Sequence, residues 1–158
     1  MLVEHDSFHK NIAESRSVFF DRIKVFPEGF LVLEIDGEIA GYISSEMWEH
    51  SENIDAERFC LNHTISEVHI SGGSELYISS IGVIKKYRGK GYGKMLFSEL
   101  VERISSSYRI ASIILIVSEN WDAARKIYEN NGFLEIQRIN GFFEDDENSD
   151  AIVMRKYL

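Results

Sequence analysis

Residues 83 to 96 read V-I-K-K-Y-R-G-K-G-Y-G-K-M-L, and this stretch indicates the fold more clearly than any other part of the chain. It follows a strand-like run from Leu76 to Val83 and precedes a helical pattern in which Leu96, Leu100 and Ile104 recur at every fourth residue. A glycine-rich connection from a strand into the N-terminus of a helix can direct several backbone N–H groups at one point. The stretch therefore predicts a phosphate site at the start of this helix.

The composition of this connection supports the same interpretation. Gly89, Gly91 and Gly93 stand at alternate positions and are free to adopt backbone angles that a Cβ atom would forbid. The chain as a whole is acidic, with a net charge of -9, yet cations are concentrated around these glycines. They are Lys85, Lys86, Arg88, Lys90 and Lys94.

Two better-known phosphate-binding loops do not fit. The dinucleotide fingerprint G-x-G-x-x-G requires a glycine at position 94, where the chain has Lys94. The P-loop G-x-x-x-x-G-K-[ST] requires Ser or Thr where Met95 stands, and its first glycine falls on Arg88. What remains is the pattern Arg88-x-x-Gly91-x-Gly93.

This pattern is similar to the [Q/R]-x-x-G-x-[G/A] signature of the GNAT superfamily, the acyl-CoA-dependent N-acyltransferases. The resemblance implies that acetyl-CoA is the acyl donor and that the loop binds its pyrophosphate. It also implies that backbone groups at the end of the preceding strand bind the pantetheine arm and that one N–H polarises the thioester carbonyl. The implied cofactor-binding residues are Ile81, Gly82, Val83, Arg88, Gly89, Lys90, Gly91, Tyr92, Gly93 and Lys94.

A second motif, N-W-D-A-A-R-K-I-Y-E-N-N-G-F from Asn120, resembles the N-x-x-A-x-x-x-Y-x-x-x-G-F motif of the same family. Ala124, Tyr128 and Gly132 keep the family spacing, but Asn120 lies one position early and Trp121 stands in its expected place. The resemblance implies that Asn120 contacts the cofactor and that Tyr128 is the general acid. A phenol with an ordinary pKa of ~10 suits protonation of a leaving thiolate. The alternative for Tyr128 is an amphipathic tyrosine with its ring in the core.

The general base is less clear. The stretch from residue 27 to 93 is similar to arylalkylamine N-acetyltransferases, which carry two histidines on the strand before the glycines. Tyr77 and Ser79 take those positions here, and neither is a good base. Glu75 acting through a water is the candidate, with a solvated strand end as the alternative. Alternation predicts that Glu75 shares one face of the strand with Tyr77, Ser79, Ile81 and Val83.

The order of elements predicts an α/β (α+β) fold with a three-layer, GNAT-like arrangement. We expect one domain over residues 1–158, with helices on both faces of a central mixed, mostly antiparallel twisted sheet of six to seven strands. The first family strand is missing or reduced to Met1 to Glu4. The expected helices are 6–26, a short one at 55–61, 91–105 and 121–130, and the expected strands are 30–35, 38–45, 76–83, 110–117, 133–139 and 151–157.

Composition excludes several classes of protein. No apolar run approaches the ~20 residues that span a bilayer, and the start lacks a secretory signal. The single cysteine, Cys60, excludes an internal disulfide, suits a reducing cytoplasm and is expected to be buried. The five histidines lack metal-ligand spacing, so no metal is expected. The pI of about 5.0 argues against nucleic acid and anionic membranes as partners.

The resemblance implies an N-acetyltransferase that acts by direct attack in a ternary complex. The expected acceptor is a small cationic primary amine, which acidic patches at 46–67 and 144–150 would attract. One alternative is a peptide or protein amine, because residues 141–154 resemble ribosomal-protein-alanine N-acetyltransferases, although the usual carboxylate of those enzymes falls at Ile116. Another is a non-catalytic acyl-CoA-binding domain. The oligomeric state, a homodimer among the options, is left open.

Overall fold

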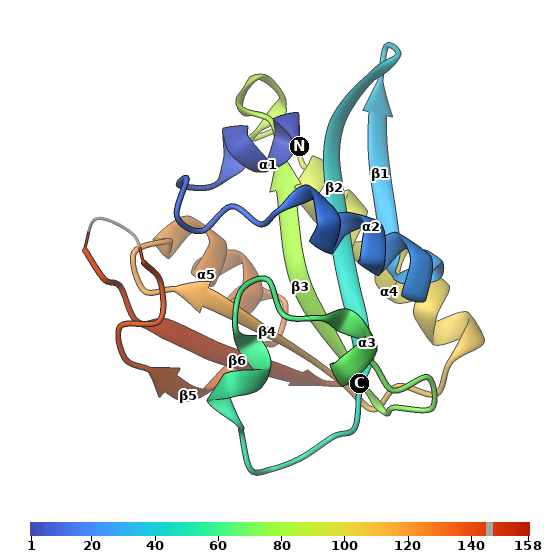
Figure 1. Ribbon diagram of the computed structural model, residues 1–158, viewed down its shortest axis with the longest axis vertical. Helices are drawn as coiled ribbons and strands as arrows, with labels where there is room; N and C mark the ends of the chain where they lie inside the picture. Colours follow the sequence, from blue (N-terminus) through green and yellow to red (C-terminus); the bar gives the residue numbers. More distant parts are fainter. Residues whose placement is uncertain (145–146) are drawn as a thin grey trace.

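The computed structural model describes residues 1–144 and 147–158, and its centre is one six-stranded sheet (Figure 1). The strand order is β1-β2-β3-β4-β6-β5. Among the neighbouring strands of the described residues, only β3 and β4 are parallel. The predicted mixed, mostly antiparallel sheet is thereby confirmed. The strands are β1 (Phe30–Ile35), β2 (Glu38–Trp48), β3 (Glu75–Val83), β4 (Ser112–Ser118), β5 (Leu134–Ile139) and β6 (Ala151–Tyr157).

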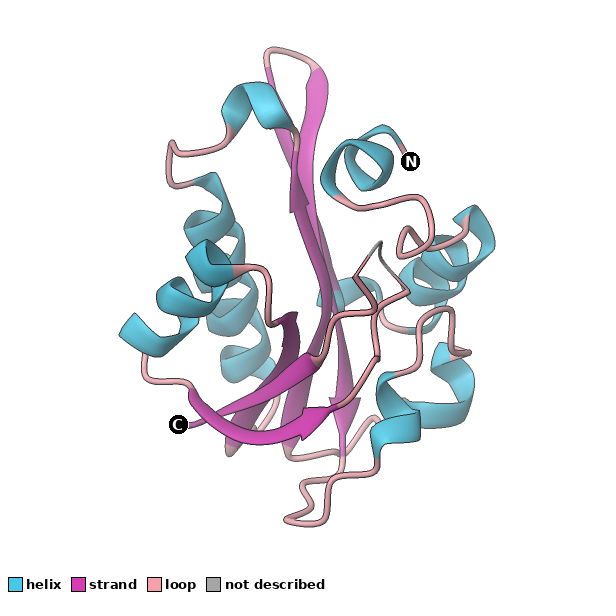
Figure 2. Cartoon of the chain, turned by 90° about the vertical axis from the view of Figure 1, so that its left-hand side faces the viewer, coloured by secondary structure: helices cyan, strands magenta, loops and turns pink. Residues whose placement is uncertain are grey.

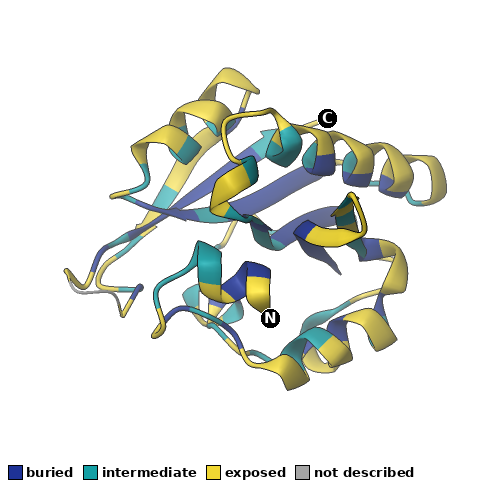
Figure 3. Cartoon of the chain, turned by 90° about the horizontal axis from the view of Figure 1, so that it is seen from above, coloured by how far each residue is buried: buried dark blue, intermediate teal, exposed yellow. Residues whose placement is uncertain are grey.

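Helices cover both faces of the sheet, as expected (Figure 2). One layer contains α1 (Leu2–Ser7), α2 (Arg16–Val25) and α3 (Ile65–Val68), and the other contains α4 (Tyr92–Ser107) and α5 (Asp122–Asn130). The inner strands β2, β3, β4 and β6 are largely buried, while the edge strands β1 and β5 and the outer sides of the helices are more exposed (Figure 3). The described residues also form three 3-10 turns: η1 (Pro27–Gly29), η2 (Ala56–Phe59) and η3 (Lys85–Tyr87).

The α4 helix explains why this chain folds around the glycine-rich stretch. Its buried residues Leu96, Leu100 and Ile104 form the stripe that the sequence predicts, and they pack in the main core. The helix contacts β1, β2 and β3. Burial of three large aliphatic side chains stabilises the folded state by roughly 1.5–3 kcal/mol each. This packing fixes the N-terminus of α4 at the end of β3.

The predicted continuous helix over residues 6–26 is wrong. The chain leaves α1 at Phe8 and enters α2 only after Ser15. In the intervening loop the amide of Glu14 donates to Oε1 of Glu4 at 2.8 Å, in place of a helical i→i−4 bond. Long-range hydrogen bonding therefore overrides the local helical pattern. Met1 to Glu4 lies at the start of α1, and the described chain before Phe30 holds helices and turns but no strand.

The predicted alternation along β3 is also wrong beyond Ile78, because the strand contains a bulge. Ser44 of β2 pairs with Ser80 while Ser45 pairs with Ile78, so Ser79 is an extra residue. A bulge shifts the faces by one position. As a result Ile81 packs in the core with α4, whereas the hydroxyls of Ser79 and Ser80 contact β2 residues on the opposite face.

Other expectations concern the surface. Cys60 is exposed rather than buried, because it ends η2 in a loop where its carbonyl oxygen lies 2.8 Å from Nδ1 of His63. The described helices include none that combines the length and apolar character of a membrane-spanning segment. Within residues 1–144 and 147–158, no three His, Cys, Asp or Glu side chains gather as a metal-binding group.

Candidate active site

A groove of about 860 Å³ opens where β3 and β4 diverge. The two strands pair only from Glu75 to Ile78 and from Ser112 to Leu115. Beyond that point β3 continues toward α1, β4 continues toward α5, and the V-shaped gap between them is visible in Figure 1. The groove is lined by the ends of both strands, by the glycine-rich connection, by α4 and α5, and by α1 with the loop that follows it. Its size is typical of a small-molecule site.

The glycine loop, residues 88–93, forms one end of this groove. Gly89 and Gly91 have φ values of 72° and 83°, a left-handed conformation that costs a residue with a Cβ about 1–2 kcal/mol. Gly91 is the N-cap of α4, and Gly93 lies within its first turn. A Cβ placed on any of the three would meet no atom within 4 Å, so their open sides face free space.

The backbone amides of this loop are available for a ligand. The first intrahelical bond of α4 runs from the Met95 amide to the Gly91 carbonyl, at 3.0 Å. The amides of residues 89 to 94 precede it and donate to no partner within the described chain. Unpaired amides at the positive end of a 16-residue helix form an anion site. The loop therefore fits a pyrophosphate, as its sequence predicts.

The Arg88 side chain lies along the loop, where it contacts protein oxygens. Its Nε donates to the Val83 carbonyl at 2.7 Å, and a terminal nitrogen donates to the Asp6 carbonyl at 3.0 Å. The Asp6 carboxylate also accepts from the Lys85 amide at 2.6 Å. Arg88 thus connects three segments: the end of β3, the glycine loop and α1. Figure 1 shows α1 beside the loop that follows β3.

Most of the predicted cofactor residues line the groove together. Two do not. The Lys90 ammonium lies 5.4 Å from the ring centroid of Tyr87, and Nδ2 of the exposed Asn120 donates to Glu147 at 2.8 Å. Those that line the groove are Ile81, Gly82, Val83, Arg88, Gly89, Gly91, Tyr92, Gly93 and Lys94.

Tyr128 lines the same groove from α5. Its ring packs edge-on against Phe133 at a centroid distance of 5.7 Å, which fixes the orientation of the phenol. Burial raises the pKa of Tyr128 to about 12. The hydroxyl therefore keeps its proton throughout the physiological range and can donate it. Burial is the one cause of this raised pKa, and no hydrogen bond from a described residue contributes to it.

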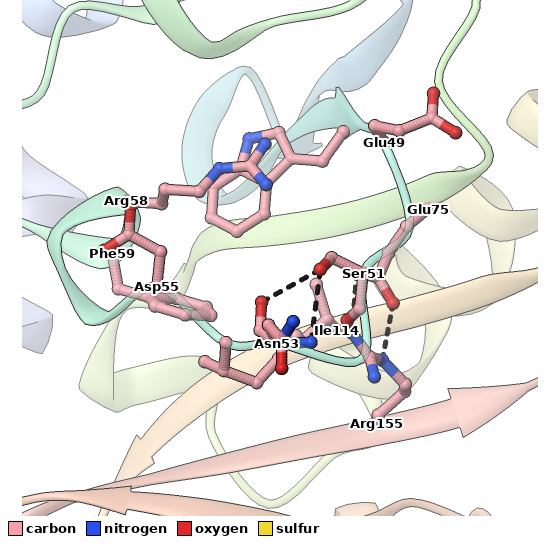
Figure 4. Close-up of a pocket in the computed structure, with 11 residues that line it drawn as sticks. Glu49, Ser51, Asn53, Asp55, Arg58, Phe59, Glu75, Ile114 and Arg155 are labelled. Atoms are coloured by element: carbon pink, nitrogen blue, oxygen red, sulfur yellow. Dashed lines mark hydrogen bonds and ion pairs between the residues drawn. The ribbon is translucent and has the colours of Figure 1, made fainter.

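The structure does not bring Glu75 near Tyr128. Glu75 begins β3, about 20 Å along the strand from Ile81, and does not line the groove. It is buried, and it accepts from Nε of Arg155 at 2.7 Å (Figure 4). It also accepts from the Ser112 hydroxyl at 2.7 Å. The space beside it has room for about one water, 10 Å³. Glu75 is thus placed as one half of a buried ion pair.

The groove contains carboxylates that the sequence does not single out. Within the described chain they are Glu4 of α1 and Glu14 of the following loop. Glu14 is paired with Arg22, whose NH2 lies 2.8 Å from Oε1. Glu4 is buried and accepts a hydrogen bond from the Tyr42 hydroxyl. Burial raises the pKa of Glu4 despite that bond. No local signal marks Glu4, because Tyr42 lies 38 positions away along the chain.

The opposite end of the groove from the glycine loop is apolar, and we call it the acceptor end. Two of its residues, Ile12 and Phe143, are buried in a small hydrophobic cluster. The predicted acidic patches contribute little here. Glu46 is fully buried and bonds to His63 at 2.7 Å, and residues 145 and 146 lie outside the described residues. The acceptor end is formed by Phe8, Ile12, Leu61, Trp121 and Phe143.

Comparisons with known proteins agree with this geometry. A family described as "Acetyltransferase (GNAT) family" matches residues 3–133. An N-alpha-acetyltransferase of Sulfurisphaera tokodaii is 26% identical over 136 residues, which are 86% of this chain and 73% of the relative. The loading GNATL domain of CurA from Lyngbya majuscula superimposes with a TM-score of 0.81 at 12% identity, covering 99% of this chain and 89% of that one. Arabidopsis thaliana Naa50, in complex with bisubstrate analogue CoA-Ac-MVNAL, gives 0.68 at 21%, covering 93% and 83%.

Proposed function

Because this chain belongs to the GNAT acetyltransferase family and is an acetyltransferase, we propose that it transfers an acetyl group from acetyl-CoA to the α-amine of a polypeptide. The observation that carries this proposal is the continuity of one groove. It joins the free amides of the glycine loop, the end of β3, the Tyr128 hydroxyl and the apolar acceptor end. A donor held by the loop and an acceptor held at the other end would meet where β3 and β4 diverge.

The donor site is built from backbone groups. Acetyl-CoA supplies the acetyl thioester when it is bound. The amides of residues 89 to 94 would hold its pyrophosphate, and Lys94 beside them adds a positive charge. β3 pairs with β4 only as far as Ile78, so the edge of Ile81, Gly82 and Val83 that faces β4 has no strand partner in the described chain. Backbone N–H groups on such an edge can bind an extended ligand and polarise a carbonyl oxygen.

Tyr128 is the proposed general acid. The C–S bond of the thioester breaks as the amine nitrogen forms its bond to the carbonyl carbon, and the departing sulfur needs a proton. The phenol carries a proton to give at neutral pH, because its pKa is raised to about 12, and Tyr128 lines the groove. Ring packing against Phe133 keeps it in place. A covalent acyl-enzyme is not part of the proposal.

The choice of a peptide acceptor rests on two observations. The relative from Sulfurisphaera tokodaii bears the name N-alpha-acetyltransferase. The acceptor end, with Phe8, Leu61 and Trp121, offers apolar side chains that suit the first side chains of a polypeptide. The second candidate is the small cationic amine expected from the sequence. The carboxylates of Glu4 and Glu14 in the groove favour it, because they attract a positive charge.

Release of free coenzyme A thiol distinguishes these candidates. Purified protein is incubated with acetyl-CoA and either short peptides, the same peptides blocked at the α-amine, or a panel of small primary amines. We expect release with the unblocked peptides only. Release with small amines only would replace the peptide proposal with the second candidate. Saturable acetyl-CoA binding without release on any panel would refute both and indicate a non-catalytic domain.

A further inference from the structure

Three side chains form a hydrogen-bonded chain between two points of the groove. Oγ of Ser80, on the bulge of β3, lies 2.6 Å from the Tyr42 hydroxyl oxygen of β2. The Tyr42 hydroxyl in turn bonds to Oε2 of Glu4 in α1. Ser80 and Glu4 both line the groove, whereas Tyr42 is buried between them. The chain therefore begins beside Ile81, where the thioester carbonyl is proposed to lie, and ends at a carboxylate.

The direction of this chain follows from counting donors. A tyrosine hydroxyl has a single proton, and an ionised carboxylate can only accept. Tyr42 must therefore donate to Glu4. Its oxygen is left to accept from Ser80, whose own hydroxyl proton is committed to Tyr42. The lone pairs of Ser80 remain free toward the groove, so both hydrogen bonds of the chain point toward Glu4 when Glu4 is charged.

We propose that Ser80, Tyr42 and Glu4 form a proton relay that removes the proton from the acceptor amine, with Glu4 as the terminal base. The inference rests on the proposed function. One proton passes from the bound ammonium to Ser80 Oγ as the Ser80 proton moves to Tyr42 and the Tyr42 proton moves to Glu4. The neutral amine then attacks the carbonyl carbon. Amide formation releases a second proton from the nitrogen, and this proton replaces the one that Tyr128 gives to the thiolate. Glu4 then returns its own proton to water in the groove.

The surroundings of Glu4 suit a base. Burial is the largest influence and raises the pKa of this carboxyl, while Tyr42 and the Glu14 amide stabilise its charged form. The charged groups that face it are Glu14 of the loop and Arg22 of α2, and they act in opposite directions. A carboxylate with a raised pKa holds a proton more firmly than an ordinary one, which makes it a better acceptor. The pKa of Tyr42 is also raised, by burial first and then by Glu4. Tyr42 is thus neutral and able to relay.

The relay predicts a change in pH dependence that a purely structural role would not produce. In Glu4→Gln the side chain keeps its shape, and its one remaining oxygen can still accept from Tyr42 at the expense of the bond from the Glu14 amide, but it cannot take up a proton. We expect kcat near neutral pH to fall by about a hundredfold or more. The wild-type kcat should level off once Glu4 has ionised. The variant kcat should keep rising until the acceptor amine loses its own proton, near pH 8 for an α-amine. The ratio of wild-type kcat to variant kcat should therefore become smaller as the pH rises.

Two further variants protect the test against misfolding. Tyr42→Phe removes one oxygen and keeps the ring, which stacks on Phe30 at 5.8 Å. Ser80→Ala removes the entrance of the relay. Both should reproduce the pH dependence of Glu4→Gln. The matched control is Ser44→Ala, because Ser44 bonds to Ser79 at 2.7 Å on the same bulge but lies outside the relay and the groove. Calorimetric titration with acetyl-CoA verifies the fold of each variant.

The outcomes separate the relay from the proposed function. If the wild-type protein releases no thiol with any amine, the proposed function fails. If the wild type turns over and the Tyr42→Phe and Ser80→Ala rates stay within twofold of wild type at every pH, the relay is refuted while the function stands. The relay is also refuted if the variants are slower than wild type by the same factor at every pH. The relay is supported if the ratio of wild-type kcat to variant kcat becomes smaller toward high pH, while the variants bind acetyl-CoA normally and Ser44→Ala keeps the wild-type rate.

Discussion

Nε of Arg88 donates a 2.7 Å hydrogen bond to the carbonyl oxygen of Val83, and this contact ties the glycine loop to the end of β3. The same guanidinium reaches the Asp6 carbonyl of α1 at 3.0 Å. Arg88 is a predicted cofactor-binding residue, and these contacts indicate that it acts on the ligand by positioning the backbone of the loop. The loop amides, held in place this way, form the donor site.

Arg88→Lys tests this positioning role. A lysine cannot form both bonds in one geometry, and the loss of one charge-assisted hydrogen bond costs roughly 1.5 kcal/mol. We expect the Kd for acetyl-CoA to rise about tenfold, with a smaller effect on kcat. Calorimetry measures the Kd. Lys86→Ala is the control, since it removes a charge from the same turn but bonds to Glu38 and does not line the groove. An equal loss of acetyl-CoA affinity in both variants would contradict the positioning role and show that only the positive charge contributes to binding.

Gly91→Ala tests the backbone conformation. Because Gly91 has φ 83°, alanine at this position strains the N-cap of α4 by about 1–2 kcal/mol. We expect weaker acetyl-CoA binding together with a similar loss of stability in urea. Gly72→Ala serves for comparison, because its Cβ would meet open space and its φ is not left-handed. Unchanged acetyl-CoA binding by Gly91→Ala would contradict the proposed amide site.

Tyr128→Phe tests the general acid. Removal of the hydroxyl should lower kcat by about a hundredfold and leave the acetyl-CoA Kd within twofold. Since the pKa of Tyr128 is about 12, the acid form persists below that pH, and the wild-type kcat should not decline between pH 8 and pH 10 on its account. The control Tyr108→Phe alters a tyrosine that packs on Phe26 outside the groove. A kcat of Tyr128→Phe equal to that of the wild type would contradict the assignment of Tyr128 as the general acid.

Glu75→Gln should act on stability instead of catalysis. It leaves the Arg155 guanidinium without its buried charged partner, and disruption of such a pair costs about 3 kcal/mol. We expect a lower urea midpoint and an unchanged kcat–pH profile. Glu52→Gln, at an exposed residue 3.9 Å from the same arginine, should leave the midpoint where it is. A shift in the pH profile of Glu75→Gln would restore Glu75 as a candidate base.

His63 should make folding stability depend on pH. Burial opposes its charge, but the hydrogen bond and charge of Glu46 outweigh burial and raise the pKa of His63. The contribution is therefore complete below the unfolded pKa of ~6.5 and is lost as the pH rises through the raised folded value. Urea unfolding of wild type and His63→Gln, compared from pH 5.5 to 8.5, measures it. The difference in the free energy of unfolding between wild type and His63→Gln should become smaller as the pH rises. A difference that stays constant would contradict a raised pKa for His63.

The sequence predicts the donor half of the site well because its determinants are local. The glycine loop, the α4 stripe and the Tyr128 motif each lie within one stretch of chain, and short-range sterics and periodicity determine them. The left-handed Gly91 and the stop at Gly132, with φ 87°, follow directly from residue type.

Other features of the groove depend on contacts between distant residues. Glu4 meets Tyr42 across 38 positions, and Arg88 meets Asp6 across 82. The bond from the Glu14 amide to the Glu4 carboxylate, ten positions away, breaks the continuous helix that local periodicity predicts over 6–26. The bulge at Ser79 likewise depends on pairing with β2, and it reverses the faces on which the choice of Glu75 as base rested. Patterns along one segment carry no information about such partners.

The most direct test of the central claim, that the amides of residues 89 to 94 bind a pyrophosphate, is a calorimetric comparison of two donors. Acetyl-CoA carries the pyrophosphate, and acetyl-pantetheine lacks it. We predict saturable binding of acetyl-CoA and binding of acetyl-pantetheine at least a hundredfold weaker, with the difference reduced in Gly91→Ala. Equal affinity for the two donors, or no heat with acetyl-CoA at millimolar concentration, would contradict the account.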